Sequence, residues 1–244
     1  MNYKAVLQYD GTRYRGWQTQ GNTDNTIQGK LETLLTKMAG EPVEVNGSGR
    51  TDAGVHAAGQ VISFRCKTKE SPEEICRYMN EYLPEDIAVL TVEEAAPRFH
   101  ARLNAVRKTY VYRIWNAPVR NVFRRRFTTW IQKPLDLDAM EQAATLICGT
   151  HDYRAFCSLK KFKKSTVRTI EKIEIGKMGQ EIRISYTGDG FLYHMVRILT
   201  GTLVEVGLGL RKPEEMTEIL EGQDRTKAGR LMPPEGLTLE SVEY

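Results

Sequence analysis

The sequence predicts an α+β fold of two similar domains, each with an antiparallel sheet that carries helices on one face. Three observations support this prediction. The chain has 244 residues, enough for two modest domains that each bury a core. Its first half reads in the order β-α-β-β-α-β, and its second half repeats that order with larger insertions. We expect a first domain over residues 1–105 and a second over residues 106–244.

The elements of the first half follow from apolar spacing and from residues that start or stop helices. Asp10-Gly11 is expected to form the turn after the first strand. Ser71-Pro72-Glu73-Glu74 is a capping box with proline at the first helical position, and it predicts a helix start. In chain order we expect a strand over residues 3–9, a helix over 26–38, strands over 42–46 and 60–65, a helix from 72 to about 82, and a strand over 87–92.

Similar signals set the elements of the second half. Asp138, with Glu141 three residues on, is expected to cap a helix that stops near Gly149, and Pro213 to start a helix that ends by Gly222. A cleft between the two halves would be the natural place for a functional site. In chain order we expect a strand over residues 108–115, a helix over 138–148, strands over 167–175 and 181–187, helices near 191–206 and 213–222, and a strand over 237–242.

Charge is unevenly distributed along the chain. Residues 98–168 hold 16 Lys and Arg against 4 Asp and Glu, whereas the formal net charge of the whole chain is only +4. Such segregation indicates a polyanionic partner, because neutralised phosphates release their counterions. We favour a nucleic acid over a merely solvated basic face, since the basic clusters alternate with aromatic residues, some of which must belong to the core. The clusters are Arg124-Arg125-Arg126 and Lys160-Lys161-Phe162-Lys163-Lys164, and the aromatic residues are Tyr110, Tyr112, Trp115, Phe123, Phe127, Trp130 and Phe156.

Several classes of protein find no support in the sequence. No apolar run approaches the roughly 20 residues of a membrane span, and the polar start lacks the core of a secretion signal, so we expect a cytoplasmic protein with no membrane contact. There is no P-loop ending, and Ser48 lacks the glycine pattern of a hydrolase elbow. We expect neither a metal nor a disulfide, because the cysteines and histidines lack ligand spacing; they are Cys66, Cys76, Cys148, Cys157, His56, His100, His151 and His194.

One glycine-rich segment combines an arginine and an aspartate: Gly47-Ser48-Gly49-Arg50-Thr51-Asp52-Ala53-Gly54-Val55-His56-Ala57. Glycines permit positive φ and let a ligand approach the backbone closely. Alone, the segment would be a tight surface turn with an exposed ion pair more often than an active-site loop. The other segments shift the balance towards an active-site loop, with Asp52 as the candidate for chemistry.

Short blocks in a fixed order cover essentially the whole chain. They are Tyr9-Asp10-Gly11-Thr12-x-Tyr14-x-Gly16-Trp17-Gln18, Gly49 to Ala57 of the glycine-rich segment, Arg98-Phe99-His100-Ala101-Arg102, Lys108-Thr109-Tyr110-x-Tyr112-Arg113-Ile114, Gly149-Thr150-His151-Asp152-Tyr153, Gly190-Phe191-Leu192-Tyr193-His194-Met195-Val196-Arg197 and Pro233-Pro234-x-Gly236-Leu237. This series resembles the bacterial tRNA pseudouridine synthase I family, TruA. The resemblance is more specific than any single block.

The resemblance implies an isomerase that breaks the N-glycosidic bond of a tRNA uridine, turns the uracil and rejoins it through carbon. Its expected targets are uridines 38, 39 and 40 of the anticodon stem-loop. It implies Asp52 as nucleophile, attacking either the sugar or the base. We expect Arg50 to pair with Asp52 and favour its ionised form, and Tyr110 to stack on the flipped uridine with its hydroxyl near the reacting atoms, although alternation alone would allow Tyr110 and Tyr112 both to be core.

The resemblance also bears on cofactors and partners. An isomerisation that adds and removes nothing needs no cofactor. The partner is tRNA, and a homodimer is expected because family members commonly pair, with a weak further reason in the apolar stretch over residues 198–210. Arg197 could equally be an ordinary helix-surface cation. A pseudouridine synthase with another RNA target and a non-catalytic RNA-binding module stay open as alternatives. The expected substrate-binding residues are Tyr110, Arg197, His56, Arg124, Arg125, Arg126, Lys160 and Lys161.

Overall fold

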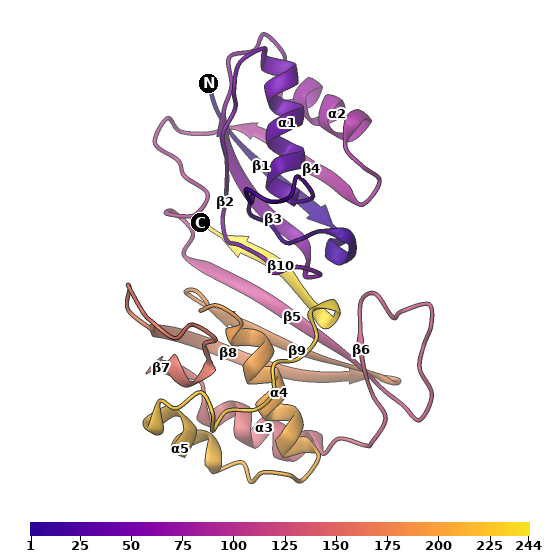
Figure 1. Ribbon diagram of the computed structural model, residues 1–244, viewed down its shortest axis with the longest axis vertical. Coiled ribbons are helices and arrows are strands. Elements are labelled where there is room, and N and C mark those ends of the chain that lie inside the picture. Colours follow the sequence, from indigo (N-terminus) through magenta and orange to yellow (C-terminus); the bar gives the residue numbers. More distant parts are fainter. The chain divides into compact units, whose positions relative to one another are not determined.

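The chain folds into two compact units in a computed structural model that describes all 244 residues (Figure 1). The first unit contains Met1–Val106 together with Thr238–Tyr244, and the second contains Arg107–Leu237. The expected division placed the C-terminal strand in the second domain, whereas the structure places the last seven residues in the first unit.

The backbone of this last strand explains its place. β10 (Leu237–Glu243) pairs in parallel with the start of the third strand, Thr238 with His56 and Leu239 with Ala57. The Val106 amide donates a hydrogen bond of 2.9 Å to the carbonyl oxygen of Glu243. These contacts satisfy backbone groups that would otherwise lie at an open sheet edge. They join residues far apart in sequence, so no local pattern predicts them.

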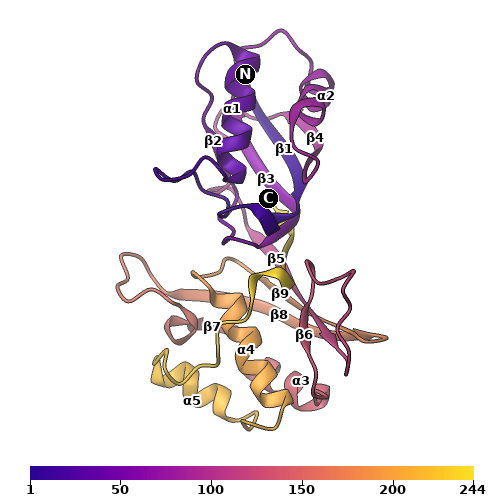
Figure 2. The same ribbon diagram turned by 45° about the vertical axis from the view of Figure 1, so that its right-hand side comes forward.

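The first unit is a mostly antiparallel sheet with two helices that contact each other beside it (Figures 1 and 2). The predicted order β-α-β-β-α-β is confirmed. β1 forms antiparallel pairs with β3 and with β4, β2 pairs with β3, and the strand order is β4-β1-β3-β10. The elements are β1 (Asn2–Tyr9), the 3₁₀ helix η1 (Gly11–Arg13), α1 (Ile27–Ala39), β2 (Val45–Gly47), β3 (His56–Arg65), α2 (Pro72–Tyr82) and β4 (Ile87–Glu94).

Local capping fixes both helices of the first unit. The Thr26 side chain accepts a hydrogen bond from the Gly29 amide, and α1 ends at Gly40 in the left-handed conformation. The capping box predicted at Ser71 and Glu74 is present in both directions. The expected strand at 60–65 was too short, because β3 already begins at His56, where its first residues find partners in β1 and β10.

The second unit combines mostly antiparallel strands with helices on one side of them (Figures 1 and 2). Its antiparallel strands follow the order β5-β9-β8-β7, and the short β6 pairs in parallel with β5. α3 contacts α4 and α5. The elements are β5 (Arg107–Asn116), β6 (Thr129–Ile131), α3 (Leu137–Leu146), β7 (Gly149–Asp152), η2 (Arg154–Phe156), β8 (Val167–Met178), β9 (Glu181–Gly188), α4 (Met195–Gly207), α5 (Glu215–Gly222) and η3 (Pro234–Gly236).

All three helix starts in the second unit differ from the prediction, and α5 begins at Glu215 rather than at Pro213. Asp136, not Asp138, caps α3, since its side chain accepts the hydrogen bond from the Ala139 amide. α4 begins only at Met195, because His194 has φ 66°, a left-handed conformation that interrupts a right-handed helix. The short strands β6 and β7 were not predicted, and β10, the strand expected to close this half, lies in the first unit. No helix of the structure combines the length and apolarity of a membrane span.

Candidate active site

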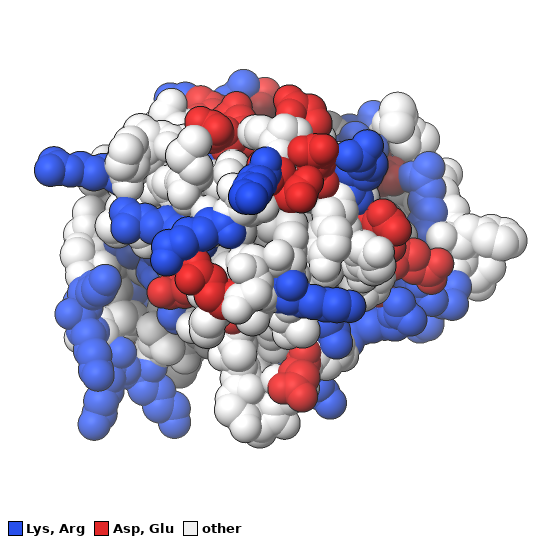
Figure 3. Space-filling view, turned by 90° about the horizontal axis from the view of Figure 1, so that it is seen from above, with Lys and Arg blue, Asp and Glu red and all other residues white.

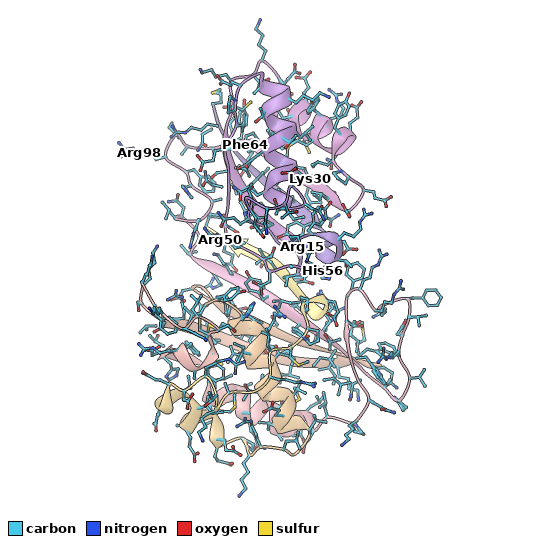
Figure 4. The ribbon with its side chains drawn as sticks, viewed as in Figure 1. Arg15, Lys30, Arg50, His56, Phe64 and Arg98 are labelled. Carbon is cyan, nitrogen blue, oxygen red and sulfur yellow. The ribbon has the colours of Figure 1, made fainter.

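Asp52 lies on the loop that joins β2 to β3, at the end of the sheet where β1 also ends. Its side chain is partly exposed, the preceding Thr51 is buried, and Arg50 is exposed. Figure 4 shows Arg50 at the same end of the first unit as Arg15 and His56. Three successive residues of the loop therefore carry an exposed cation (Arg50), a buried hydroxyl (Thr51) and a partly exposed carboxylate (Asp52).

Side-chain hydrogen bonds hold the part of the loop before Arg50. The Ser48 hydroxyl donates to Gln60 Oε1 at 2.6 Å, and Gln60 Nε2 donates to the Gly49 carbonyl at 3.0 Å. The Ser48 amide donates to the Val61 carbonyl at 2.8 Å. Ser48 and Gln60 are both fully buried. Buried polar groups that satisfy each other rigidify a segment, because breaking one bond leaves the partner without compensation.

Backbone hydrogen bonds hold the part of the loop around Asp52. The Trp17 amide donates to the Thr51 carbonyl at 3.0 Å, and the Val55 amide donates to the Asp52 carbonyl at 3.1 Å, which closes a turn. Among the three glycines of the segment, Gly54 has a positive φ of 79°. Gly47 serves close approach instead, since a Cβ there would lie 2.5 Å from the Trp17 ring.

His56 is buried at the first residue of β3, with 3% of its surface exposed. Its Nδ1 accepts a hydrogen bond of 3.1 Å from the Gly11 amide and lies 3.2 Å from Asp10 Oδ1. The imidazole therefore joins the end of β1 to the end of the Asp52 loop.

The predicted ion pair between Arg50 and Asp52 does not form. The guanidinium of Arg50 makes no ion pair or hydrogen bond, and the residue is exposed. An exposed arginine gains little from an ion pair in water, because solvation and side-chain entropy offset the attraction. Arg50 is thus available to a ligand.

Tyr110 and Tyr112 share β5 but have different surroundings. Tyr112 is fully buried, and its hydroxyl lies 2.6 Å from Thr129 Oγ1 and donates to the Pro233 carbonyl at 2.7 Å. Burial raises the pKa of Tyr112 well above its usual value. Tyr110 retains 8% exposure, and the edge of its ring meets Phe191 at a centroid distance of 5.2 Å. Tyr112 is a core residue, whereas Tyr110 sits at the margin of the core.

Arg197 is not an ordinary surface cation. It lies in the first turn of α4 with 8% exposure, and its Nε donates to the Met232 carbonyl at 2.7 Å. Arginine is rarely this buried unless its charge is compensated, because desolvation of an ion is costly. Sequence alone could not tell whether Arg197 is an exposed helix-surface cation or a buried one, because its hydrogen-bond partner Met232 is distant along the chain.

The basic clusters differ in how far their charges are already engaged. Arg124 forms an ion pair with Glu181, a buried carboxylate that also accepts from Arg183 Nε at 2.7 Å. Arg125 donates to the Val122 carbonyl at 2.7 Å. Lys160 and Lys161 are exposed and make no ion pair. On the face shown in Figure 3, lysine and arginine side chains lie among aspartate and glutamate side chains, and several of them project from the rim. Arg126 is also exposed.

The structure brings Arg50, Asp52 and His56 together in the first unit, and it places the other predicted residues in the second. The cleft expected between the two halves stays a prediction. Sequence reasoning missed three residues that support the loop, Tyr9, Trp17 and Gln60. Tyr9 and Trp17 belong to one of the quoted blocks, which was the available signal. No group of three or more His, Cys, Asp or Glu side chains comes together in a metal-binding arrangement.

Comparison with known proteins identifies the family. Residues 5–104 and 143–244 match a family model described as tRNA pseudouridine synthase. The chain belongs to this family. It is 48% identical over 243 residues to "tRNA pseudouridine synthase A" of Bacillus sp. (strain KSM-64), covering 100% of this chain and 99% of the relative. It is 46% identical over 241 residues to "tRNA pseudouridine synthase A" of Brevibacillus brevis, covering 99% and 98%. "tRNA pseudouridine synthase A 2" of Bacillus anthracis is 44% identical over 243 residues, with 100% and 99% covered.

Proposed function

We propose that the protein isomerises uridine to pseudouridine in tRNA, at positions 38, 39 and 40 of the anticodon stem-loop. The reaction is supported by the family match, which includes the Asp52 loop, and by relatives named tRNA pseudouridine synthase A that align over the full chain. The three positions rest on the resemblance of the sequence blocks. The observation that carries the proposal is a partly exposed carboxylate, Asp52, on a loop held by buried hydrogen bonds.

Asp52 is the proposed nucleophile. The reaction breaks the bond between N1 of uracil and C1′ of ribose, forms the bond between C5 and C1′, and moves the proton of C5 to solvent while N1 gains one. A carboxylate assists by adding covalently to the sugar or to the base and leaving again. A rigid loop suits this role, because a nucleophile gains rate when it is held in attacking geometry before the substrate arrives.

The other candidate residues have supporting roles in the proposal. Arg50, whose guanidinium is exposed and without an ion pair, contacts the RNA. Tyr110 stacks on the flipped uridine and takes part in proton transfer. Arg197 and His56 are proposed to contact substrate. Arg125, Arg126, Lys160 and Lys161 contact phosphates, and Arg124 does so with its remaining donors.

Substitution of Asp52 tests the proposal. Asp52→Asn keeps the shape of the side chain and removes the nucleophile, so we expect no detectable tritium release from C5-labelled tRNA, with tRNA affinity retained. Asp24→Asn, at another exposed aspartate of the same unit, is the matched control and should remain active. Turnover by Asp52→Asn near the wild-type rate would refute the assignment.

Mapping of pseudouridine in tRNA from a strain that lacks the gene tests the target. Loss at positions 38–40 supports the proposal. Loss in another RNA would identify a synthase with a different target, and normal modification everywhere would favour a non-catalytic RNA-binding module.

We also propose a cytoplasmic homodimer, supported by the tRNA substrate and by the family resemblance. The apolar stretch 198–210 does not supply the contact surface, since nearly all of α4 is buried within the single chain. Large apolar side chains are instead exposed on the loop between β5 and β6: Val119, Val122, Phe123 and Phe127.

A further inference from the structure

Thr51 is the residue through which the protein fixes Asp52. It directly precedes Asp52, and only 6% of its surface is exposed. Its hydroxyl lies 2.8 Å from the hydroxyl of Tyr9, at the end of β1, and its carbonyl accepts a hydrogen bond of 3.0 Å from the Trp17 amide. The side chain and the backbone of Thr51 are therefore both anchored, one to the last residue of β1 and the other to the segment that follows it.

The planarity of the peptide bond transmits this anchoring to Asp52. The Thr51 carbonyl and the Asp52 Cα belong to one planar peptide unit, so the bond from Trp17 sets the plane from which the Asp52 side chain projects. The bond to Tyr9 fixes the Thr51 side chain and with it the remaining rotation of Thr51. Together with the hydrogen bond from the Val55 amide to the Asp52 carbonyl, these two bonds restrict the backbone on both sides of Asp52 and leave chiefly rotation of its own side chain.

The environment of Tyr9 makes its bond to Thr51 a firm one. Tyr9 is 4% exposed, and burial raises the pKa of its hydroxyl to about 12, partly opposed by its hydrogen bonds to Thr51 and Gln60. The hydroxyl is thus protonated at neutral pH and able to donate. In a buried setting such a bond is stronger than in water, and loss of one partner leaves the other unsatisfied.

We propose that Tyr9 is a positioning residue for the reaction: its hydroxyl, acting through Thr51, holds the Asp52 carboxylate in attacking geometry. This inference rests on the proposed role of Asp52 as nucleophile. Tyr9 contacts neither carboxylate nor substrate in this scheme. Its ring has a separate role in packing, since it lies 6.3 Å from the Trp17 ring, and this role survives removal of the hydroxyl alone.

Tyr9→Phe tests the proposal, because it removes the hydroxyl and keeps the ring. We expect the single-turnover rate of pseudouridine formation to fall by about tenfold to a hundredfold, as misplacement of a reacting group does, with tRNA Kd unchanged. Tyr3→Phe is the matched control. Tyr3 is a buried tyrosine on the same strand, and its ring stacks on Phe64, remote from the loop. The single-turnover rate of Tyr3→Phe should equal that of the wild type.

A second variant separates positioning from a general loss of stability. Thr51→Val removes the other hydroxyl of the same bond, so it should also slow the reaction, and the Tyr9→Phe/Thr51→Val double variant should be no slower than the slower single variant. Thermal melting of each variant shows that it is folded at the assay temperature.

The outcomes distinguish the two proposals. Tyr9→Phe turning over within about twofold of wild type, while Asp52→Asn is inactive, overturns the positioning role and leaves the function intact. A slow Tyr9→Phe beside a normal Thr51→Val also overturns it, because the effect would not pass through their bond. An active Asp52→Asn overturns both proposals.

Discussion

Tyr110 and Tyr112 lie on one strand and look alike in the sequence, but the structure gives them different surroundings. Tyr110 and Tyr112 alternate onto the same face of β5, yet the hydroxyl of Tyr112 is closed off by Thr129 and Pro233, whereas Tyr110 keeps some exposure. The two tyrosines therefore differ in packing although they share one face of the strand. Each tyrosine has its own expected response to loss of the hydroxyl.

Tyr110→Phe should keep the melting temperature and tRNA affinity of the wild type and lose turnover by about a hundredfold, as expected for a proton-transfer group. Tyr112→Phe should behave in the opposite way. It leaves the Pro233 carbonyl without its donor, so it should lower the free energy of unfolding by about 1–3 kcal/mol with little change in rate. Denaturant unfolding and single-turnover kinetics on both variants check the pair. A Tyr110→Phe rate within about threefold of wild type would reduce Tyr110 to stacking or packing.

The candidate site was predictable where a short motif carried it. Asp52 and Arg50 stand out in sequence because they occur together among glycines. Their surroundings were not predictable, since Arg50 proves to be exposed and unpaired, while Arg197 is buried against Met232. The exposure of Arg50 and the burial of Arg197 both depend on how segments that are distant in the sequence fold around them. The supports of Asp52, which come from Tyr9 and Trp17, were missed for the same reason.

At the scale of elements, the sequence predicted helices with regular apolar periodicity, but it did not predict where irregular backbone starts or interrupts a helix. The helix start at Ser71 was predicted from its capping box, and the helix that begins after Thr26 was predicted from apolar spacing. The cap of α3 was assigned two residues late, because Asp136 and Asp138 are both plausible caps and only Asp136 accepts from the Ala139 amide. Hydrogen-bonding geometry decides between two such neighbours, and spacing alone does not.

The turn after β1 is an element whose shape depends on a glycine. A Cβ on Gly11 would overlap the carbonyl oxygen of Val55, which is backbone and cannot move aside as a side chain can. We expect Gly11→Ala to lower stability by about 1–3 kcal/mol, as overpacking does, and to slow turnover, because Val55 closes the turn on Asp52. Thermal melting and single-turnover rates measure both effects.

Gly21→Ala is the matched control for Gly11→Ala. Gly21 belongs to the same connection between β1 and α1, and nothing lies within 4 Å of a Cβ built on it. Its variant should melt and react as the wild type does. A Gly11→Ala protein that is equally unaffected would show that the turn after β1 and the Asp52 loop are not in close contact.

At the scale of the whole molecule, the sequence predicted two α+β halves and the segregation of charge, and it misplaced the last strand. β10 has the alternation of a strand, but its partner β3 is known only from the fold. Composition, in contrast, does not depend on the fold. The excess of Lys and Arg over residues 98–168 therefore predicts positive surface charge directly. Charges such as that of Arg124, which forms an ion pair with Glu181, are the exception.

This surface charge should make tRNA binding strongly dependent on salt. Each phosphate that a cation neutralises adds about 0.7–0.9 to the slope of log affinity against log salt concentration.

Lys160 and Lys161 are exposed and without ion pairs, so both are available to phosphates. We expect the Lys160→Gln/Lys161→Gln variant to reduce the slope by about 1.4–1.8 and to weaken binding similarly for all tRNAs, because phosphate contacts carry no sequence information. Lys69→Gln/Lys177→Gln removes the same charge from exposed lysines outside the basic segment and should leave the slope unchanged. Filter binding at four or more salt concentrations measures these slopes. Equal slopes for the two variants would show that net charge, rather than the basic segment, governs the encounter with tRNA.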